Sequence, residues 1–279
     1  MSGQDLPVGD RSGENEVQAQ VTPREGPSRV CPRSYPHYDS GGLTDVRRFV
    51  DLNIRDPGDT RVLTEMLELA SKLGFKGITL SSERPQPQMM RNKALSVGID
   101  LSNRIDLRPR STNELSKALR RVRRKFEIIA VCCENKTVSR QAAKDHRVDI
   151  LTFPPLRTNK SRVGLDRQGA ALASKSNCAY EICLSDLLEP SVDRARFLID
   201  LKRDISNAIH EGVPMVVSSG AGSPLQMREP RAIASITNLL GISKDKGLDA
   251  VSEIPRIILE RNREKLRLGF ISPGVKEVR

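Results

Sequence analysis

The chain of 279 residues contains three histidines and no tryptophan, and aromatic residues make up 3% of it. Enzymes that cleave phosphoesters with metal ions commonly hold those ions with clustered histidines and carboxylates. His37, His146 and His210 lie far apart in the sequence, and no two of them are close enough to form a helical or strand pair. The scarcity of histidine therefore argues against a polynuclear metal site, and no motif marks a magnesium site built from carboxylates alone.

Long apolar runs are also missing. No stretch reaches the roughly 18 apolar residues that cross a bilayer, and Met1 is followed by polar sequence. We therefore expect no membrane association and a cytoplasmic location. The five cysteines form no C-x-x-C pattern, and Cys132 and Cys133 end an apolar run. We predict reduced, mostly buried thiols.

Positive charge is what the chain has in excess, since 46 Lys and Arg stand against 35 Asp and Glu, a formal net charge of +11. Residues 1–40 contain four arginines and six acidic residues, so the rest of the chain carries +13. Such a surplus attracts polyanions, of which nucleic acid is the commonest. From charge alone, an ordinary enzyme with a surplus that keeps it soluble is an equal alternative.

Residues 1–40 are rich in Gly, Pro, Ser, Gln and Glu and have few large apolar side chains. Such a stretch cannot bury enough surface to offset the entropy of ordering it. We predict a disordered extension over 1–40 and one folded domain over 41–279.

Within the folded domain, short runs of β-branched and apolar residues alternate with amphipathic stretches. The runs that predict strands are Arg48–Asn53, Lys76–Ser81, Ile99–Leu107, Phe126–Cys132, Val148–Phe153, Ala179–Leu184 and Val213–Ser218. The stripes that predict helices are Leu63, Met66, Leu67 and Ala70; Leu115, Ala118, Leu119 and Val122; and Phe197, Leu198, Leu201 and Ile205. Ser111 and Glu114 have the spacing of a capping box, which predicts a helix start there.

Strand–helix alternation favours a parallel sheet with helices outside. Seven or eight units of this kind predict a single-domain α/β protein with a TIM-like (β/α) barrel, and an open doubly wound sheet is the alternative. No G-x-G-x-x-G motif follows the first strand, which removes the most specific argument for that alternative. Near the end, Leu248–Val251 is a candidate eighth strand and Ile254–Lys265 a candidate closing helix.

Basic residues gather between positions 104 and 125, where nine bases stand against two acids. Arginine predominates, and its planar fork suits phosphate. Few aromatic residues are present to stack on bases, so contact would be to RNA backbone and shape. A solvated face is the alternative for any single cluster. The residues that we predict to bind RNA or a partner are Arg104, Arg108, Lys117, Arg120, Arg121, Arg123, Arg124, Arg157, Lys160 and Arg162.

A run of small residues follows the last predicted strand and comprises Ser218, Ser219, Gly220 and Ala221, with a further glycine behind them. In parallel barrels such a loop can cradle a phosphate with backbone N–H groups. It can equally be a tight connection from strand to helix, and the sequence leaves both readings open. Neither these serines nor the cysteines have a candidate base at a recognisable spacing, so we predict no catalytic residue.

Several segments, taken together and in order, are similar to one known family. They are Phe49–Asn53, Leu107–Pro109, Arg123–Val131, Lys144–Phe153, Glu181–Ile182, Val217–Ala221, Arg228–Arg231, Val251–Pro255, Asn262–Lys265 and Pro273–Val275. From about residue 46 onward the chain resembles ribonuclease P protein component 3, the archaeal relative of the thirty-kilodalton protein of eukaryotic ribonuclease P. The resemblance adds Arg228 and Arg231 to the predicted binding residues.

This resemblance implies a β/α barrel related to a phosphoesterase superfamily but without its metal-binding histidines. Asp51-Leu52-Asn53 stands where a His-x-His pair would be expected. It also implies a ribonucleoprotein that removes the 5′ leader of precursor tRNA. The implied partners are ribonuclease P RNA, protein component 2 and other protein subunits. We expect Mg²⁺ on that RNA and no cofactor on the chain itself.

Two other functions are alternatives to a brace for RNA. A metal-dependent phosphoesterase would bind metal and cleave a phosphoester without RNA. A pure protein scaffold would use its apolar helix faces to bind a partner, and its basic residues would only be solvated.

Overall fold

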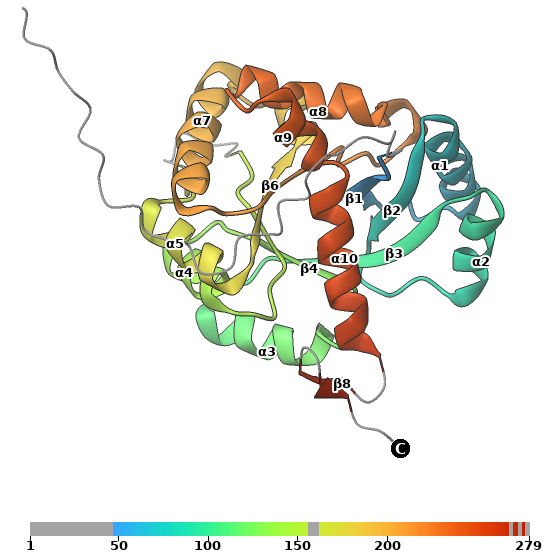
Figure 1. Ribbon diagram of the computed structural model, residues 1–279, viewed down its shortest axis with the longest axis horizontal. Helices are drawn as coiled ribbons and strands as arrows, with labels where there is room; N and C mark the ends of the chain where they lie inside the picture. Colours follow the sequence, from blue (N-terminus) through green and yellow to red (C-terminus); the bar gives the residue numbers. More distant parts are fainter. Residues whose placement is uncertain (1–46, 156–161, 268–269, 273–274, 277–279) are drawn as a thin grey trace, which may run out of the picture. The chain divides into compact units, whose positions relative to one another are not determined.

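The computed structural model describes residues 47–155, 162–267, 270–272 and 275–276 (Figure 1). The predicted disordered extension over 1–40 lies outside these residues, so it stays a prediction. Within them, seven parallel strands form one sheet in which each strand pairs with the next along the chain. The strands are β1 (Phe49–Arg55), β2 (Phe75–Ser81), β3 (Asp100–Leu107), β4 (Ile128–Cys132), β5 (Ile150–Thr152), β6 (Ala179–Cys183) and β7 (Met215–Ser218). All seven predicted strands are confirmed, with ends shifted by a few residues.

The sheet closes on itself where β1 and β7 approach each other. Ile54 of β1 forms an isolated parallel bridge with Ala221, and Arg55 N–H donates to the Ala221 carbonyl at 2.8 Å. Near the start of β1, Val50 N–H donates to the Val251 carbonyl at 2.9 Å, and Val217 N–H of β7 donates to the Ala250 carbonyl at 3.0 Å. The TIM-like barrel is confirmed, and the open doubly wound sheet is wrong.

The prediction of an eighth strand at Leu248–Val251 is wrong. Residues 248 and 249 end helix α9 (Lys244–Asp249), and residues 250–252 form a turn. Ala250 and Val251 nevertheless supply carbonyls to both β7 and β1, so two residues of a turn occupy the place of a strand. The apolar pattern of this segment reflects its burial in the seam, since Ala250 and Val251 are 3% and 2% exposed.

Helices lie between the strands and cover the outside of the barrel (Figure 1). They are α1 (Thr60–Lys72), α2 (Gln88–Ser96), α3 (Thr112–Val122), α4 (Lys136–Lys144), α5 (Arg167–Ser176), α6 (Leu184–Leu188), α7 (Arg194–Glu211), the 3₁₀ turn η1 (Pro224–Gln226), α8 (Pro230–Leu239), α9 and α10 (Glu253–Leu266). The closing helix is therefore confirmed as α10, and β8 (Phe270–Ser272) pairs antiparallel with β9 (Val275–Lys276) after it. None of the helices in the described ranges is long and apolar enough to span a bilayer.

Helix α3 shows how local sequence sets an element. The side chain of Ser111 accepts a hydrogen bond from Glu114 N–H at 3.2 Å, while Glu114 accepts one from Arg110 N–H at 2.9 Å. These bonds satisfy N–H groups that the first turn leaves without partners. Leu115 and Leu119 are fully buried on one face of the helix. The predicted start and the predicted apolar stripe are both confirmed.

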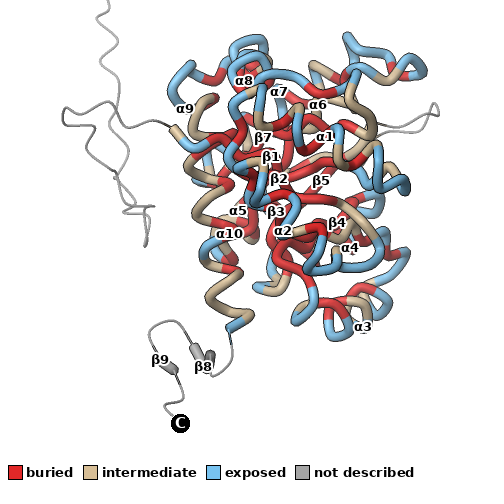
Figure 2. Tube along the Cα trace, turned by 90° about the vertical axis from the view of Figure 1, so that its right-hand side faces the viewer, coloured by how far each residue is buried: buried red, intermediate tan, exposed pale blue. Residues whose placement is uncertain are grey.

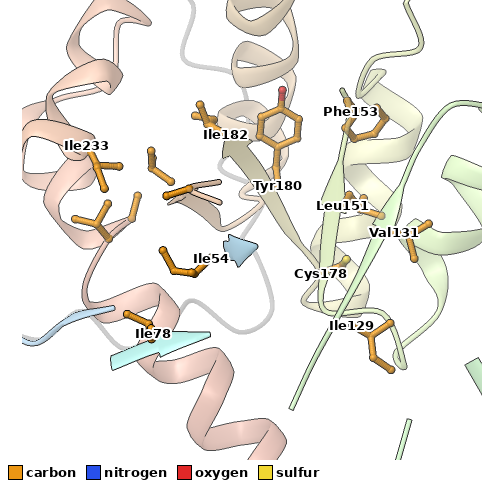
Figure 3. Close-up of a cluster of buried hydrophobic side chains, with 14 of the residues drawn as sticks. Ile54, Ile78, Ile129, Val131, Leu151, Phe153, Cys178, Tyr180, Ile182 and Ile233 are labelled. Carbon is orange, nitrogen blue, oxygen red and sulfur yellow. The ribbon is translucent and has the colours of Figure 1, made fainter. Parts of the chain in front are cut away.

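The core has two parts. The larger part lies between the strands and the helices, and Figure 3 shows some of its side chains, including Ile129, Val131 and Tyr180. Figure 2 shows the same arrangement by burial, with the strands buried and the helices exposed on their outer turns. The smaller part lies inside the barrel, toward the strand starts, and Ile258 and Leu259 of α10 pack against it. Its strand residues are Val50, Leu52, Ile128, Ala130, Ile150, Ala179 and Val216.

Candidate nucleic-acid interface and barrel mouth

The barrel interior changes from apolar to polar along the strands. Side chains alternate between the two faces of a strand, so Ile128 and Ala130 share their face of β4 with Cys132. In the same way Ala179 of β6 shares a face with Glu181. At the C-terminal ends this polar face lines a cavity of about 670 Å³, here called the mouth. Its lining residues are Asn53, Arg55, Arg104, Asp106, Arg108, Cys132, Glu134, Thr152, Pro154, Pro155, Glu181, Cys183, Ser185, Asp186 and Glu189.

Arg104 of β3 lines the mouth from the barrel interior. Its side chain is 1% exposed, and its two terminal nitrogens each lie 2.6 Å from an oxygen of Glu181, whose side chain is 0% exposed. The Nη1 atom also donates to the Leu52 carbonyl at 3.0 Å, and Ser218 donates its hydroxyl to Glu181 at 2.7 Å. A buried charge requires this degree of pairing. The position that we predicted to contact RNA is therefore an internal ion pair.

Asp106 lies on the rim side of the same guanidinium. It accepts hydrogen bonds from Arg104 Nε and Nη2 at 3.0 and 2.7 Å, and from the Ser81 hydroxyl. Burial raises the pKa of Asp106, but the charge and hydrogen bonds of Arg104 outweigh burial and hold the pKa below its ordinary value. Arg104 therefore pairs with two carboxylates, Asp106 and Glu181.

The loop of small residues after β7 is tied to β1. Ser219 N–H lies 3.2 Å from both carboxylate oxygens of Asp51, and Gly220 N–H donates to the Asn53 carbonyl at 2.9 Å. Ala221 N–H donates to the Ser219 hydroxyl at 3.1 Å. All three amides already have internal acceptors, so this loop offers none of them to a phosphate. The reading as a tight connection holds, and the phosphate cradle at Ser218, Ser219, Gly220 and Ala221 is corrected.

Asp51 and Asn53 occupy the positions where the resemblance led us to expect a His-x-His pair. Burial raises the pKa of Asp51 to about 6, partly offset by hydrogen bonds from Ser219 and from Asn53 N–H. Asn53 is 7% exposed, and its side-chain nitrogen lies 3.8 Å from Cys183 Sγ. The Asp51 side chain thus holds the β1–β7 seam, while the Asn53 side chain reaches across to β6.

The remaining acidic groups of the mouth do not converge on one point. Asp186 lies 3.9 Å from Arg55, and burial together with the charge of Glu181 raises its pKa to about 6. Glu134 pairs with Arg108 at 3.0 Å on the exposed rim. Among the described residues, no group of three or more His, Cys, Asp or Glu is placed to hold a metal ion.

Two further predicted binding residues are paired within the fold. Arg162 is 4% exposed, donates to Asp204 at 2.8 Å and to the Phe153 carbonyl at 2.7 Å, and lies over the Phe197 ring. The prediction that Arg162 contacts RNA is corrected, because its guanidinium is enclosed. Arg123 is 14% exposed and pairs with Asp149 at 2.6 Å. Its Nη2 atom is buried and has no hydrogen-bond partner among the described residues.

Helix α3 and the turn that follows it carry the predicted basic surface. Four of the predicted binding residues are exposed there, and Arg108, Arg228 and Arg231 are exposed elsewhere. These four residues, called the α3 face below, are Lys117, Arg120 and Arg121 of the helix and Arg124 just after it. The amphipathic pattern correctly predicts that these four side chains are exposed, since Leu115 and Leu119 on the opposite face are buried.

The other predicted binding residues are dispersed. Arg157 and Lys160 lie outside the described residues. Arg228 is exposed but donates to the carbonyls of Leu225 and Met227, and Arg231 at the start of α8 lies 5.4 Å from the centre of the Phe49 ring. The predicted binding residues in the described part of the chain therefore lie on several separate elements.

Comparisons with known proteins match the chain to one family. A family model described as "RNase P subunit p30" matches residues 48–267. A protein of Methanosarcina mazei named "Ribonuclease P protein component 3" is 28% identical over 222 residues, which cover 79% of this chain and 91% of that protein. A protein of Methanococcoides burtonii with the same name is 29% identical over 232 residues, covering 82% of this chain and 94% of that protein.

A solved structure shares the fold. It is a chain in "cryo-EM structure of archaeal Ribonuclease P with mature tRNA", with a TM-score of 0.70 and 22% identity. The similarity covers 82% of this chain and 98% of that chain. The barrel described above is thus also found in a chain of that assembly.

Proposed function

The chain belongs to the RNase P subunit p30 family, and we propose on this premise that it is a non-catalytic brace for the RNA of ribonuclease P. In that role the assembly removes the 5′ leader of precursor tRNA, and the chain neutralises and positions RNA phosphates. The family places the chain in an endoribonuclease holoenzyme. The relatives named "Ribonuclease P protein component 3" support the same role, since the chain matches more than nine-tenths of their length.

The exposed α3 face is the observation that carries the brace. Its four cations lie close together along the chain, and no carboxylate among the described residues forms an ion pair with them. Arg104 and Arg162, in contrast, form buried ion pairs within the fold. RNA folds only when its phosphates are neutralised, and fixed cations share that task with Mg²⁺. The protein then lowers the Mg²⁺ concentration that the RNA requires.

A metal-dependent phosphoesterase is the less favoured function. Glu181, the deepest carboxylate of the mouth, is neutralised by Arg104 at 2.6 Å, and Asp51 accepts a backbone N–H of Ser219. Carboxylates that ligate a metal need free lone pairs directed at one point. These two are directed elsewhere.

Several features of the assembly follow from this function. The partners would be ribonuclease P RNA, protein component 2 and other protein subunits, with precursor tRNA reached through the holoenzyme. Mg²⁺ would be bound by the RNA and no cofactor by this chain. A cytoplasmic location suits the described cysteines, which are free thiols and are largely buried.

The test is a Mg²⁺ titration of precursor tRNA cleavage by the reconstituted holoenzyme. The variant replaces each residue of the α3 face by glutamine, and we expect cleavage to need more Mg²⁺. In binding assays, the log–log salt dependence should flatten by about 0.7–0.9 for each phosphate that the variant no longer neutralises. The matched control removes four exposed charges elsewhere, at Lys72, Lys93, Lys244 and Lys246. Identical titrations for the α3 variant and the wild type would refute the proposal.

A further inference from the structure

At the end of the barrel opposite the mouth, one carboxylate forms ion pairs with two arginines. Asp149, 0% exposed and next to β5, accepts from Arg123 Nη1 at 2.6 Å and from Ile129 N–H at 2.9 Å through the same oxygen. Arg261 of α10, the long red helix in Figure 1, lies with Nη2 at 3.5 Å from the other oxygen. Asp149 therefore holds Arg123 firmly and Arg261 loosely.

Lys265 brings a third cation to the same place, one helical turn after Arg261. Its Nζ lies 3.5 Å from the side-chain oxygen of Asn262, and in the part of the chain that the structure describes no carboxylate is within ion-pair distance of it. The pKa of Lys265 is lowered to about 8, first by burial and then by the positive charges of Arg261 and Arg123. Three cations thus share the charge of Asp149.

Two of the guanidinium nitrogens at this place also lack acceptors. Arg123 Nη2 and Arg261 Nε are buried and have no hydrogen-bond partner among the described residues. Buried donors without acceptors are uncommon in folded proteins, and each one requires a physical explanation. An anion between the three side chains would supply both acceptors and negative charge.

Neighbouring arginines of α10 show that this imbalance is local. Arg263 pairs with Asp100 at 2.6 Å, and Arg256 pairs with Glu260 at 2.6 Å. Arg147, close to Arg123, has its own partner in Asp145 at 2.7 Å. The surplus of positive charge therefore belongs to Arg123, Arg261 and Lys265, and not to the basic composition of the helix as a whole.

We propose that Arg123, Arg261 and Lys265 form a binding site for one backbone phosphate of RNA, here called the α10 phosphate site. The inference rests on the proposed function, which supplies RNA as the polyanion. A phosphodiester carries one negative charge and presents its oxygens in several directions. It therefore matches donors that arrive from two helices. This site lies near the strand starts, whereas Arg108 lies at the strand ends, so the two contact different segments of RNA.

The experiment measures binding of the full-length chain to ribonuclease P RNA over a range of salt concentrations. Lys265→Gln and Arg261→Gln are compared with Arg256→Gln, which removes the same charge from a paired position of the same helix. We expect the log–log slope to fall by about 0.7–0.9 in each of the first two variants, because they share one phosphate, and to stay unchanged in Arg256→Gln. Arg261 also donates to the Asn177 carbonyl at 2.9 Å, so Lys265→Gln is the cleaner variant.

The outcomes separate this inference from the proposed function. If the wild type binds RNA and both variants keep its slope, the α10 phosphate site is wrong while the brace stands. If the wild type does not bind the RNA alone or in the holoenzyme, the brace itself is wrong. Loss of binding to a protein subunit with an unchanged RNA slope would also overturn the site, because it would make the surface a protein interface.

A second measurement does not depend on affinity. The side-chain amine of Lys265 is titrated by NMR in the full-length chain, alone, with RNA and with inorganic phosphate. RNA should raise the pKa of Lys265 toward the ordinary value of lysine. A rise with inorganic phosphate and none with RNA would overturn the assignment to RNA, and no rise with either would overturn the site.

Discussion

Arg104 on β3 and Glu181 on β6 form a bidentate ion pair across the interior of the barrel, with both nitrogen–oxygen distances at 2.6 Å. The two residues are 77 positions apart in the chain. Together with Asp106 they form a closed network at the point where the strand ends converge. The mouth is therefore lined here by charged groups that are paired with one another.

Replacing Arg104 by methionine should destabilise the protein strongly. The change leaves Glu181 and Asp106 buried without their cation, and breaking a buried pair typically costs about 3–5 kcal/mol. Urea unfolding at neutral pH measures the loss. Arg108→Met is the control, because its pair with Glu134 is exposed and should contribute below about 1 kcal/mol. Equal losses in the two variants would contradict the structural role of the internal pair.

Replacing Gly220 by alanine should disrupt the seam between β7 and β1. Gly220 has a φ of +64°, and an added Cβ would lie 2.3 Å from the Ser185 hydroxyl and 2.5 Å from Cys183 Sγ. Gly241 also has a positive φ, of +83°, but a Cβ there meets nothing within 4 Å. Gly241→Ala should therefore cost only about 1 kcal/mol of backbone strain, and Gly220→Ala clearly more. Thermal unfolding of both variants compares them, and a smaller loss at Gly220 would be inconsistent with the packing described.

Replacing Asp186 by asparagine should change the pH dependence of stability. The pKa of Asp186 is raised to about 6 in the folded chain, first by burial and then by Glu181, so the folded state binds more protons than the unfolded state between about pH 4 and 6. The free energy of unfolding contributed by this group thus falls as pH rises through that window. Asp186→Asn removes the fall, so its advantage over the wild type should be larger at pH 7 than at pH 4.

The control for this pH effect is Asp166, whose pKa is shifted in the opposite direction. Burial raises the pKa of Asp166, but the Gly169 N–H bond and the pairs with Arg140 and Lys136 outweigh burial and lower it overall. Asp166→Asn should therefore lose stability at neutral pH, and the loss should fade as pH falls below about 4. Denaturant unfolding at several pH values measures both variants, and parallel profiles would rule out this account.

Removing the cap of α3 should weaken the helix that carries the α3 face. Ser111→Ala deletes the acceptor for Glu114 N–H, a loss that usually costs about 1 kcal/mol. Ser111→Asp keeps an acceptor and should retain stability. Hydrogen exchange of the first α3 amides provides the local measurement. Unchanged exchange in Ser111→Ala would show that the cap does not hold the helix start.

Most of the fold could be predicted from the sequence because most elements have a strong local pattern. The stripe of Leu63, Met66 and Leu67 is buried as α1 requires, and β4 is continuous in apolar residues, as in parallel barrels. The predicted strand at Ala250 and Val251 is wrong, because this turn is apolar as a result of its burial alone. No local pattern distinguishes two residues that hydrogen-bond to a sheet from a strand of that sheet.

Only part of the candidate site could be predicted from the sequence. The pattern of α3 placed its exposed cations correctly, yet the same surplus of arginine included Arg104 and Arg162, which are enclosed. One local signal could have excluded Arg104. It alternates with Ile105 within a strand, so it faces away from the helices and toward the barrel interior. Its partner Glu181 lies too far along the chain for any periodicity to indicate, and the same holds for Asp149 beside Arg261 and Lys265.

The seam at Ala250 and Val251 has a consequence for synthesis of the chain. Val50, in the first of the described strands, receives its hydrogen-bond partner from residue 251, some 200 positions later. The neighbours of β1 on this border, Gly220, Ala221 and Val251, all lie more than 160 positions after β1, and contacts of such long range form slowly. The nascent protein therefore has an unpaired sheet edge through most of translation. A chaperone could bind the nascent chain at this edge.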